Sequence, residues 1–533
     1  MTLGRAPRQG DLLDDITSFC DATLSQDSVY AFLHRERDRL FPDEFFTDLF
    51  TEQGRRSVPP SVVATVMVLQ RLEGLSDREA VERFTFDARW RYAAGVGGYD
   101  GEGRWSFVHT VLVDMRERLR RSDRPDRVFE VTRETAAAAG LLGRRRVLDS
   151  TPLYDAVATM DTVTLMRSAL RALLAVAGPR EPELRAACRS GDDYSSTAKP
   201  QIDWDDEAAR EALIDSRARD AFACLALLEG TELSPELAQA ARLLAAVTGQ
   251  DLEGGDDGGF RIARRVAADR IISTVDPEAR HGHKTNARNF DGYKGHIAID
   301  PDAEVITSMA VTAGNVGDAT VVGELLGDCL ASDADRDGER SSVSEPLEVY
   351  GDSAYGSGAV LGTFHDADVV AMVKVQAAVA AQGRFSKDDF RIDVAARTVT
   401  CPNHVTVSYE VQRNGEGVAQ FKTACWGCAL RSQCTGSPHG RQVTIGPYEV
   451  HLTAARQRQQ DAAWQARYRA TRPKVERKLA HLMRRRHGGR RARVRGRLRV
   501  AQDFSWLGAA VNLSRLAALR IWHTPAGWAV ASA

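Results

Sequence analysis

Two short apolar runs, each ending near an aspartate, most constrain how this 533-residue chain can fold. The first covers residues 144–151 and contains Asp149, and the second covers residues 347–352 and ends at Asp352. Short apolar runs bounded by turn residues are typical of buried strands. Because ligands of open α/β sheets bind outside the ends of the strands, the sequence predicts two carboxylates at a binding edge.

Further strand signals lie between and after these two runs. Residues 293–300 and 305–311 flank a Pro-Asp turn and predict a hairpin, and residues 369–374 form another apolar run after a short helical stretch. Residues 156–250 are helical in pattern, with alanine- and leucine-rich stretches. The order of strand, inserted helices, hairpin, strand, helix, strand, insertion and one long helix predicts an α/β fold with a mixed sheet and flanking helices.

The N-terminal part has a different pattern. Apolar residues recur at helical spacing over residues 29–135, and Ser76 with Glu79 forms the signature of a capping box. The helical segments around residues 77–92 could form a helix-turn-helix that reads DNA, or they could belong to a plain helical bundle. The sequence leaves both interpretations open.

A third acid stands out in the most basic part of the chain. Residues 467–499 contain 15 Lys or Arg residues but one acid, Glu476, although the whole chain has a net charge of −2. One interpretation is a simple i,i+4 ion pair between Arg472 and Glu476 on a solvated helix. However, Glu476 borders an apolar stripe, so it could also reach a metal ion beside a surface that binds phosphate. The stripe consists of Trp464, Tyr468, Val475, Leu479 and Leu482.

Three carboxylates of this kind match a defined chemistry. Phosphoryl transfer in DNA is well served by two divalent cations about 3.5–4 Å apart, which clamp the attacking and leaving oxygens. Magnesium prefers oxygen ligands and retains some of its waters. Asp149, Asp352 and Glu476 are therefore the candidate catalytic residues and the candidate ligands of Mg²⁺ or Mn²⁺.

The chain resembles a known family over nearly its whole length, from about Phe41 to Trp522. It is similar to DDE transposases of bacterial insertion sequences that have an InsH-like N-terminal domain and a cysteine-bearing insertion, the IS eleven-eighty-two group. The matching N-terminal and central segments are Phe41-Pro42-Asp43-Glu44, Gly74-Leu75-Ser76-Asp77-Arg78-Glu79, Leu148-Asp149-Ser150-Thr151-Pro152 and Ser273-Thr274-Val275-Asp276-Pro277-Glu278-Ala279-Arg280. The later ones are Gly292-Tyr293-Lys294-Gly295-His296, Gly351-Asp352-Ser353-Ala354-Tyr355-Gly356, Arg472-Pro473-Lys474-Val475-Glu476-Arg477 and His487-Gly488-Gly489-Arg490-Arg491.

The resemblance implies a ribonuclease-H-like core with Asp149, Asp352 and Glu476 as its metal-binding triad. Related transposases place Tyr, Arg, Glu and Lys at set spacings on the helix that carries the glutamate. Here Arg472 and Glu476 fit that spacing. Tyr468 comes one residue too early, and Met483 takes the place of the lysine, with Arg484 beside it.

We therefore expect a metal-dependent DNA transposase that cleaves and rejoins double-stranded DNA at the terminal repeats of an insertion sequence, acting as a homodimer on element ends and target. The alternatives are a ribonuclease-H-like nuclease without strand transfer and a non-catalytic DNA-binding descendant of a transposase.

The predicted DNA-binding residues are Arg472, Arg477, Arg484, Lys294 and His296. Lys294 and His296 alternate along one predicted strand, so both face one side of it, where they could line the active site or pack at the edge of the core. Asp276 could touch DNA or metal, or it could belong to a turn held by ion pairs.

A second constellation is formed by cysteines. Cys401, Cys425, Cys428 and Cys434 fall within one short stretch, with predicted strands between the first two. Cysteines at such spacing in a reducing compartment read as zinc ligands, which predicts a small zinc-ribbon-like insertion. His404 lies three residues after Cys401, so five candidates compete for four positions. The family resemblance favours the four cysteines, whereas the spacing of short pairs favours His404 over Cys434.

These observations divide the chain into several predicted units. The units are a helical DNA-binding domain at 1–135, a catalytic core at 140–160, 270–380 and 450–525, a helical insertion at 161–269, and the cysteine-bearing insertion at 385–445. Residues 1–11 contain no apolar segment typical of a secretory signal, and no apolar run approaches the roughly 20 residues that span a bilayer. We therefore expect a cytoplasmic bacterial protein that associates with the nucleoid when it binds DNA and has no membrane partner.

Overall fold

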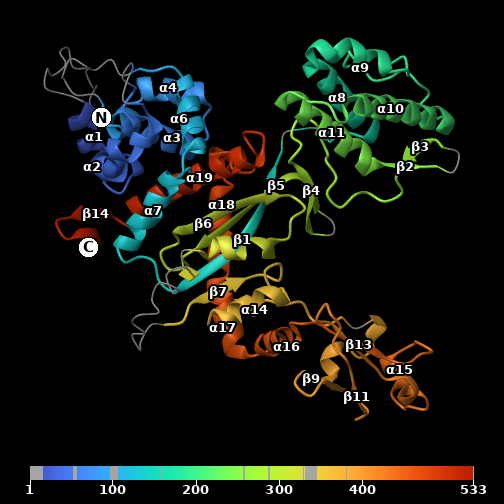
Figure 1. Cartoon of the computed structure of the whole chain (residues 1–533). Coiled ribbons are helices and arrows are strands. Elements are labelled where there is room, and N and C mark those ends of the chain that lie inside the picture. The colour runs from blue at the N-terminus through green and yellow to red at the C-terminus, as the bar shows by residue number, and fades with distance from the viewer. Residues whose placement is uncertain are drawn as a thin grey trace, which may run out of the picture.

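The computed structural model describes residues 16–51, 54, 57–96, 106–155, 157, 159–255, 258–285, 288–327, 329–330, 345–379 and 381–531. The N-terminal segment 1–11, on which the prediction about a secretory signal rests, lies outside this range. A mixed sheet occupies the centre of the molecule in Figure 1. Helices of the N-terminal region lie on one side of it, and two smaller units project on the other.

The central sheet has six strands and is mixed, as predicted. They are β1 (Arg145–Tyr154), β4 (Arg280–Thr285), β5 (Arg288–Ile299), β6 (Ile306–Ala313), β7 (Glu348–Gly351) and β8 (Val370–Val373). β5 pairs antiparallel with β4, β6 and β1, whereas β1, β7 and β8 run parallel to one another. The predicted hairpin is the β5–β6 pair.

Alternate residues of the inner strands face two separate cores. Val147 of β1 and Tyr350 of β7 belong to a large core that includes helix α18 (Pro473–Leu482) and helix α19 (Arg497–Ala518). Leu148 and Val349 point to the opposite face and pack with α12 (Val322–Leu325) and α14 (Gly358–Asp366). Because both faces are covered, consecutive residues are buried in the middle of these strands, at 147–148 in β1 and 349–350 in β7.

Helix α19 joins the sheet to the N-terminal helices in one continuous core. Every residue from 504 to 513 is buried, so this stretch of the helix is enclosed on all sides. Gly508 allows a close approach to β6, because a β-carbon there would lie 2.0 Å from the sulfur of Met309. The N-terminal elements are α1 (Ile16–Thr23), α2 (Val29–Leu40), η1 (Asp43–Leu49), α3 (Pro60–Glu73), α4 (Asp77–Phe86), α5 (Ala88–Ala93), α6 (Thr110–Arg121) and α7 (Arg127–Ala138).

The capping box predicted at the start of α4 is confirmed. The Ser76 side chain accepts from the Glu79 backbone, and the Glu79 side chain accepts from the Ser76 backbone. The element after it favours the helical-bundle interpretation over a helix-turn-helix. α5 is only six residues long and turns Trp90 and Tyr92 into the interior, which leaves little side-chain surface for reading bases.

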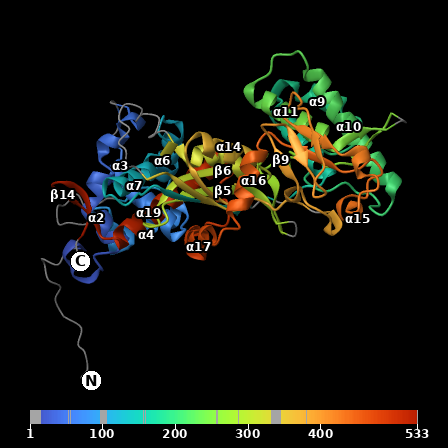
Figure 2. The ribbon, with the colours of Figure 1, turned by 90° about the horizontal axis from the view of Figure 1, so that it is seen from below.

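The two projecting units have cores of their own. The helical unit contains α8 (Thr162–Val176), η2 (Gly178–Arg180), α9 (Glu181–Ala187), α10 (Glu207–Leu228), α11 (Pro235–Asp251), β2 (Leu252–Gly254) and β3 (Phe260–Ile262). The cysteine-bearing unit contains η4 (Ala381–Gly383), η5 (Lys387–Asp389), β9 (Arg391–Asp393), β10 (Thr398–Thr400), β11 (Thr406–Ser408), β12 (Gly417–Gln420), η6 (Lys422–Cys425), α15 (Arg431–Cys434) and β13 (Gln442–Ile445). Both lie on the side of the sheet away from the N-terminal helices (Figures 1 and 2).

The basic segment does not form the single long helix that we expected. It comprises α17 (Ala462–Thr471) and α18, which meet at Arg472, and then the turn η7 (Arg485–His487) and a loop. Pro473 occupies the first position of α18, where its missing N–H costs nothing, so a second helix begins there. Helix α16 (Glu449–Arg458) precedes α17, and the hairpin of β14 (Ile521–Thr524) and β15 (Gly527–Val530) follows α19.

The loop around His487 is tied to the end of α3. The Arg71 guanidinium donates to the His487 carbonyl, and a His487 ring nitrogen lies within hydrogen-bond distance of the Leu72 carbonyl. Gly74 ends α3 in the left-handed conformation, and a β-carbon there would lie 2.3 Å from the Arg486 carbonyl oxygen. Among the described helices, none is both long and apolar enough to cross a bilayer.

Candidate active site

The strand register brings Asp149 and Asp352 to the same level of the sheet. β1 and β7 are parallel neighbours in which Val147 lies opposite Tyr350. Asp149 follows Val147 by two residues, and Asp352 follows Tyr350 by two. Because successive side chains alternate between faces, both aspartates project on the face that is covered by α18.

Helix α18 delivers Glu476 to the same face. Val475 and Leu482 of this helix are fully buried, and the helix packs against β1. The preceding helix α17 is anchored to the end of β7, because the Tyr468 hydroxyl donates to the Gly351 carbonyl at 3.1 Å. Tyr468 therefore holds the junction of the two helices beside Asp352, although it departs from the family spacing.

Arg472, at this junction, contacts all three acids. Its Nη2 lies 3.0 Å from Oδ1 of Asp149 and 3.9 Å from Oδ2 of Asp352, and its Nη1 lies 3.5 Å from Oε1 of Glu476. The arginine side chain is 7 % exposed, whereas the Glu476 side chain is 63 % exposed. The predicted Arg472–Glu476 pair thus exists, but it is part of a larger cluster that also includes the strand aspartates.

The burial of Asp149 changes its acidity. Removal from water raises the pKa of its carboxyl to about 6, and the nearby charge of Asp352 acts in the same direction. The Arg472 guanidinium and the backbone N–H of Ser150 act in the opposite direction. A carboxyl with such a pKa in a cleft is a recognised sign of a functional site. It is still ionised at neutral pH, so it can act as a cation ligand.

The three acids open onto one cleft with a volume of about 780 Å³. All three line it, together with Arg472. The other basic residues in its walls are His283, Lys284, Arg288, Lys294 and Arg490. The cleft therefore combines carboxylates at its floor with cations around them, a distribution that suits a phosphodiester bound near divalent metal.

The structure places the predicted DNA-binding residues in different surroundings. Arg472 and Lys294 line the cleft, and Lys294 donates to Asp318 at 2.9 Å and to the Val316 carbonyl at 2.8 Å. Arg477 is exposed on α18 and pairs with Glu304, outside the cleft lining. Arg484 is exposed at the start of the loop after α18.

His296 is buried completely and does not line the cleft. Its Nε2 lies 2.9 Å from the Thr312 hydroxyl, and burial lowers the pKa of the ring to about 4. Lys294 reaches the cleft from the same strand because it is longer and lies nearer the open edge. Of the two interpretations for this side of the strand, packing at the edge of the core describes His296, and lining of the cleft describes Lys294.

Sequence reasoning missed Asp318. This aspartate lines the cleft, accepts from Lys294, and accepts from the Ser150 hydroxyl at 2.5 Å. It begins the short 3-10 helix η3 (Asp318–Val321) after β6, with no apolar strand run directly before it, so no strand-end signal marked it. Its side chain is 9 % exposed, which makes it a buried partner of Lys294 beside Asp149.

Asp276 has a structural environment. It is 1 % exposed, both of its carboxylate oxygens lie 2.8 Å from the Tyr293 hydroxyl, which donates to them, and it accepts from the Gly496 backbone at 3.1 Å. These bonds tie β5 to the start of α19. Of the two interpretations of the Asp276 region, the turn held by polar contacts describes this residue, whereas His283 and Lys284 of the same region reach the cleft.

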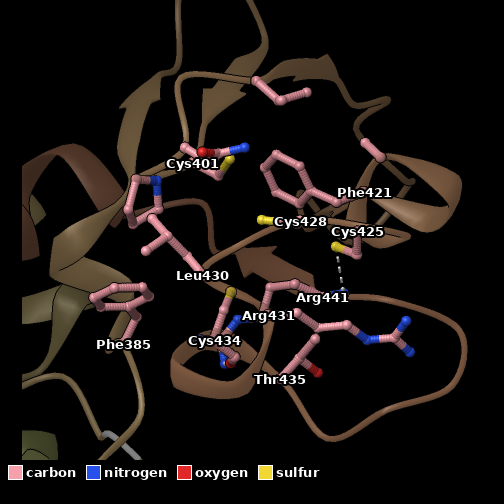
Figure 3. A pocket seen from close by; sticks show the side chains of 14 residues that line it. Phe385, Cys401, Phe421, Cys425, Cys428, Leu430, Arg431, Cys434, Thr435 and Arg441 are labelled. Carbon is pink, nitrogen blue, oxygen red and sulfur yellow. Dashed lines mark hydrogen bonds between the residues drawn. The ribbon is translucent and has the colours of Figure 1, made fainter.

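The four cysteines line a second, much smaller pocket of about 20 Å³ (Figure 3). Cys401 follows β10, Cys425 and Cys428 lie in and after η6, and Cys434 ends α15. Figure 3 shows their side chains around one space that Phe385, Phe421 and Leu430 also border. His404 is exposed and is not among the residues that line this pocket.

In neither of these two clusters of described residues are the side-chain donor atoms close enough together to coordinate one metal ion. Within the described residues, no three His, Cys, Asp or Glu side chains are grouped so that they could hold a metal ion. The donor chemistry nevertheless fits: carboxylate oxygens suit Mg²⁺ or Mn²⁺, and thiolates suit Zn²⁺. In the cleft, the Arg472 guanidinium lies among the carboxylates, as its three ion-pair distances record.

Comparison with known families identifies both ends of the chain. A family model described as "Transposase domain (DUF772)" matches residues 18–118, and one described as "Transposase DDE domain" matches residues 400–517. The second match includes Glu476 and the four cysteines, whereas Asp149 and Asp352 lie between the two matches. No curated protein and no solved structure matches the chain. The two matched domains show that the chain is a transposase of the IS eleven-eighty-two type, with a DUF772 N-terminal domain and a DDE domain, and a transposase is an enzyme that binds DNA.

Proposed function

We propose that this transposase cleaves and rejoins DNA at the terminal repeats of an insertion sequence, with the chemistry in the cleft between β1, β7 and α18. The observation that carries the proposal is the convergence of Asp149, Asp352 and Glu476 on Arg472 within a cleft lined by basic residues. The three acids come from segments that are far apart in the chain, so their convergence is a property of the fold.

The sheet supports assignment of a ribonuclease-H-like core. Antiparallel β6, β5 and β1 are followed across the sheet by β7 and β8, which run parallel to β1. This mixed arrangement, with helices on both faces, agrees with the fold that the family resemblance implies. It also explains why the acids must come from the first strand, its parallel neighbour and a late helix.

Asp149, Asp352 and Glu476 would hold the divalent cations. Mg²⁺ or Mn²⁺, when bound, supplies charge stabilisation and lowers the pKa of an attacking water or hydroxyl. Lys294, fixed by Asp318 and the Val316 carbonyl, would orient a phosphate of the bound strand from the wall of the cleft. Because Lys294 keeps its position in the folded protein, it would need little reorganisation when the phosphate binds.

Incubating the protein with Mg²⁺ and labelled duplexes that carry the element ends tests this function. We expect cleavage that frees a 3′-hydroxyl at the element end, followed by joining of that end to target DNA. Cleaved ends that never join target would favour the nuclease alternative. Binding without cleavage would favour the non-catalytic alternative. Sedimentation of the DNA complex checks the expected homodimer.

We also propose that Cys401, Cys425, Cys428 and Cys434 bind one structural zinc. All four line the same pocket, and the pKa of the Cys434 thiol is raised by burial, with the other three cysteines acting in the same direction. His404 lies outside the pocket lining, which favours the four-cysteine set over the set containing His404. The pocket precedes α16 and α17 in the chain, so zinc would help to position the helices that carry Arg472 and Glu476.

A further inference from the structure

Arg472 occupies the position between the three acids with an incomplete set of hydrogen bonds. Its Nη2 approaches both strand aspartates and its Nη1 lies 3.5 Å from Oε1 of Glu476, yet neither the buried Nε nor the buried Nη1 makes a hydrogen bond. A buried guanidinium nitrogen without a partner costs free energy. The arginine is thus held by charge more than by geometry, which is a weak way to hold a side chain in one place.

The three carboxylates would bind a divalent cation at the position that the Arg472 guanidinium occupies. A guanidinium and a divalent ion repel each other strongly at such distances when both are buried. The two cannot share Asp149, Asp352 and Glu476 in this arrangement. In the described residues no three acids are close enough to hold one metal ion, and Arg472 lies between the ones concerned.

Arg472 also lines the cleft, so an incoming phosphate would meet its guanidinium. Arginine binds phosphate in a bidentate manner that satisfies two N–H groups at once. A phosphate therefore offers the guanidinium the hydrogen bonds that it lacks among the acids. The long Arg472 side chain extends from the α17–α18 junction. Helix geometry fixes the backbone there but not the side chain, so the guanidinium can move.

We propose that Arg472 competes with the divalent cation for Asp149, Asp352 and Glu476, and that a DNA phosphate draws the arginine away, so that DNA binding and metal binding strengthen each other. This inference rests on the proposed function of the cleft. It makes Arg472 a coupling residue in addition to a phosphate contact. The coupling must be reciprocal, because each ligand changes the affinity of the other by the same factor.

Titration of the full chain with Mn²⁺, followed by electron paramagnetic resonance of the free ion, tests the coupling. The DNA is a duplex element end with phosphorothioates at and beside the scissile position, which resist cleavage. For the wild type we expect DNA to tighten the Mn²⁺ dissociation constant by about tenfold or more, within the range typical of coupled sites. Arg472→Gln should bind Mn²⁺ about tenfold more tightly than the wild type without DNA, and DNA should then add less than about threefold.

Arg490→Gln is the matched control, because Arg490 lines the same cleft but makes no ion pair with the three acids. It should keep the coupling of the wild type. An Arg472→Gln protein whose Mn²⁺ affinity is unchanged or weaker, or which keeps the full gain from DNA, would overturn the inference. If this variant does not fold, as judged by circular dichroism, Arg472→Lys replaces it and should show an intermediate gain in Mn²⁺ affinity; no gain would again overturn the inference.

The outcomes separate this inference from the proposed function. A wild type that cleaves DNA while Arg472→Gln binds Mn²⁺ no more tightly would overturn only the competition. If the Asp149→Asn variant binds Mn²⁺ with the same affinity as the wild type, the assignment of Asp149 as a metal ligand is overturned.

Discussion

The carboxylate cleft and the cysteine pocket are two candidate metal sites that are assembled in opposite ways. The cleft takes its acids from β1, β7 and α18, and it is wide, polar and lined with cations. The pocket takes its four thiols from residues 401–434, and it is small, with mainly aromatic and aliphatic walls that Arg431 and Arg441 border. One site is made by the topology of the sheet, the other by a local run of turns and short strands.

The difference follows from the charge of the two kinds of ligand. Carboxylates remain ionised near neutral pH even when burial raises a pKa to about 6, as for Asp149, so their cluster needs a counter-charge. Arg472 provides it. Burial raises the pKa of the Cys434 thiol, so the cysteine cluster needs no arginine ion-paired within it, although Arg431 and Arg441 border its pocket. Four experiments can break or sharpen this contrast.

Removing one acid should have the largest effect. Asp149→Asn, Asp352→Asn and Glu476→Gln should each lower the rate of DNA cleavage by about a thousandfold or more, because each removes a metal ligand without changing shape. Binding to the element end should stay within about threefold, since interactions with phosphates dominate affinity. The measurements are cleavage of labelled ends and a binding assay in EDTA.

Asp302→Asn provides the control for these variants. Asp302 is an exposed acid that pairs with Arg145 and Lys474, outside the cleft. Its loss should leave cleavage near the wild-type rate. Full activity in any of the three cleft variants would remove that residue from the proposed triad.

Loss of zinc is expected to destabilise the protein although none of the cleft carboxylates is changed. Cys425→Ser should abolish zinc binding and lower the free energy of unfolding by several kcal/mol, because a structural zinc contributes directly to folding. Metal analysis and thermal melting of purified protein measure this. Zinc-free protein that melts normally and cleaves DNA would show that the cysteines merely pack.

Two variants serve as controls for the cysteine site. Cys188→Ser should keep the zinc, because Cys188 lies 3.6 Å from Cys224 in the helical unit, far from the pocket in the chain. His404→Ala should also keep it if the four cysteines are the ligands. Loss of zinc in His404→Ala would instead favour the ligand set that contains His404 over Cys434.

Asp149 should give the cleft a pH dependence that the cysteine pocket lacks below neutrality. Its pKa is about 6 in the folded protein against an ordinary value of 3.8, so the folded state binds the proton more tightly. This group therefore stabilises the fold at low pH, and that contribution, up to about 3 kcal/mol, is lost as pH rises from about 4 through about 6. Cleavage should change in the opposite direction, because the ionised carboxylate is the proposed metal ligand.

Denaturant unfolding of the wild type and Asp149→Asn in EDTA measures this effect. The stability of the variant relative to the wild type should increase across this pH range and then level off. A difference that stays constant from about pH 4 to about pH 7 would mean that burial does not raise the pKa of Asp149.

The smallest expected effect concerns the basic loop beside the cleft. Arg484, Arg485 and Arg486 are exposed. Changing all three to alanine should weaken binding to every DNA sequence and reduce the salt slope by roughly 0.9 for each phosphate that the loop no longer neutralises. The measurement is DNA affinity across a salt series. Relaxed sequence preference at an unchanged salt slope would mean that the loop reads bases.

A matched change in the helical unit controls for net charge. Arg180, Arg185 and Arg219 pair with local acids on that unit and lie outside the cleft lining. Replacing these three should leave the salt slope largely unchanged. An equal decrease in slope would attribute the effect to total charge and not to the loop.

Local patterns were sufficient for much of this protein. Apolar runs and turns predicted β1, the β5–β6 hairpin, β7 and β8, because a strand's composition reflects its own burial. The capping box at Ser76 was readable for the same reason: its hydrogen bonds join residues three apart. The cysteines could be grouped from spacing alone, since a short chain segment limits how far they can separate. The break before α18 was also visible as Pro473, but the apolar stripe across it suggested one helix.

Only the tertiary structure decided how these parts meet. The parallel register of β1 and β7 set Asp149 level with Asp352, and the packing of α18 placed Arg472 between them and Glu476. It also brought Asp318 to Lys294, buried His296 and left His404 outside the cysteine pocket. These facts depend on contacts between segments far apart in the chain. The free energy of such contacts arises from burial and charge in the assembled fold, so no local pattern records them.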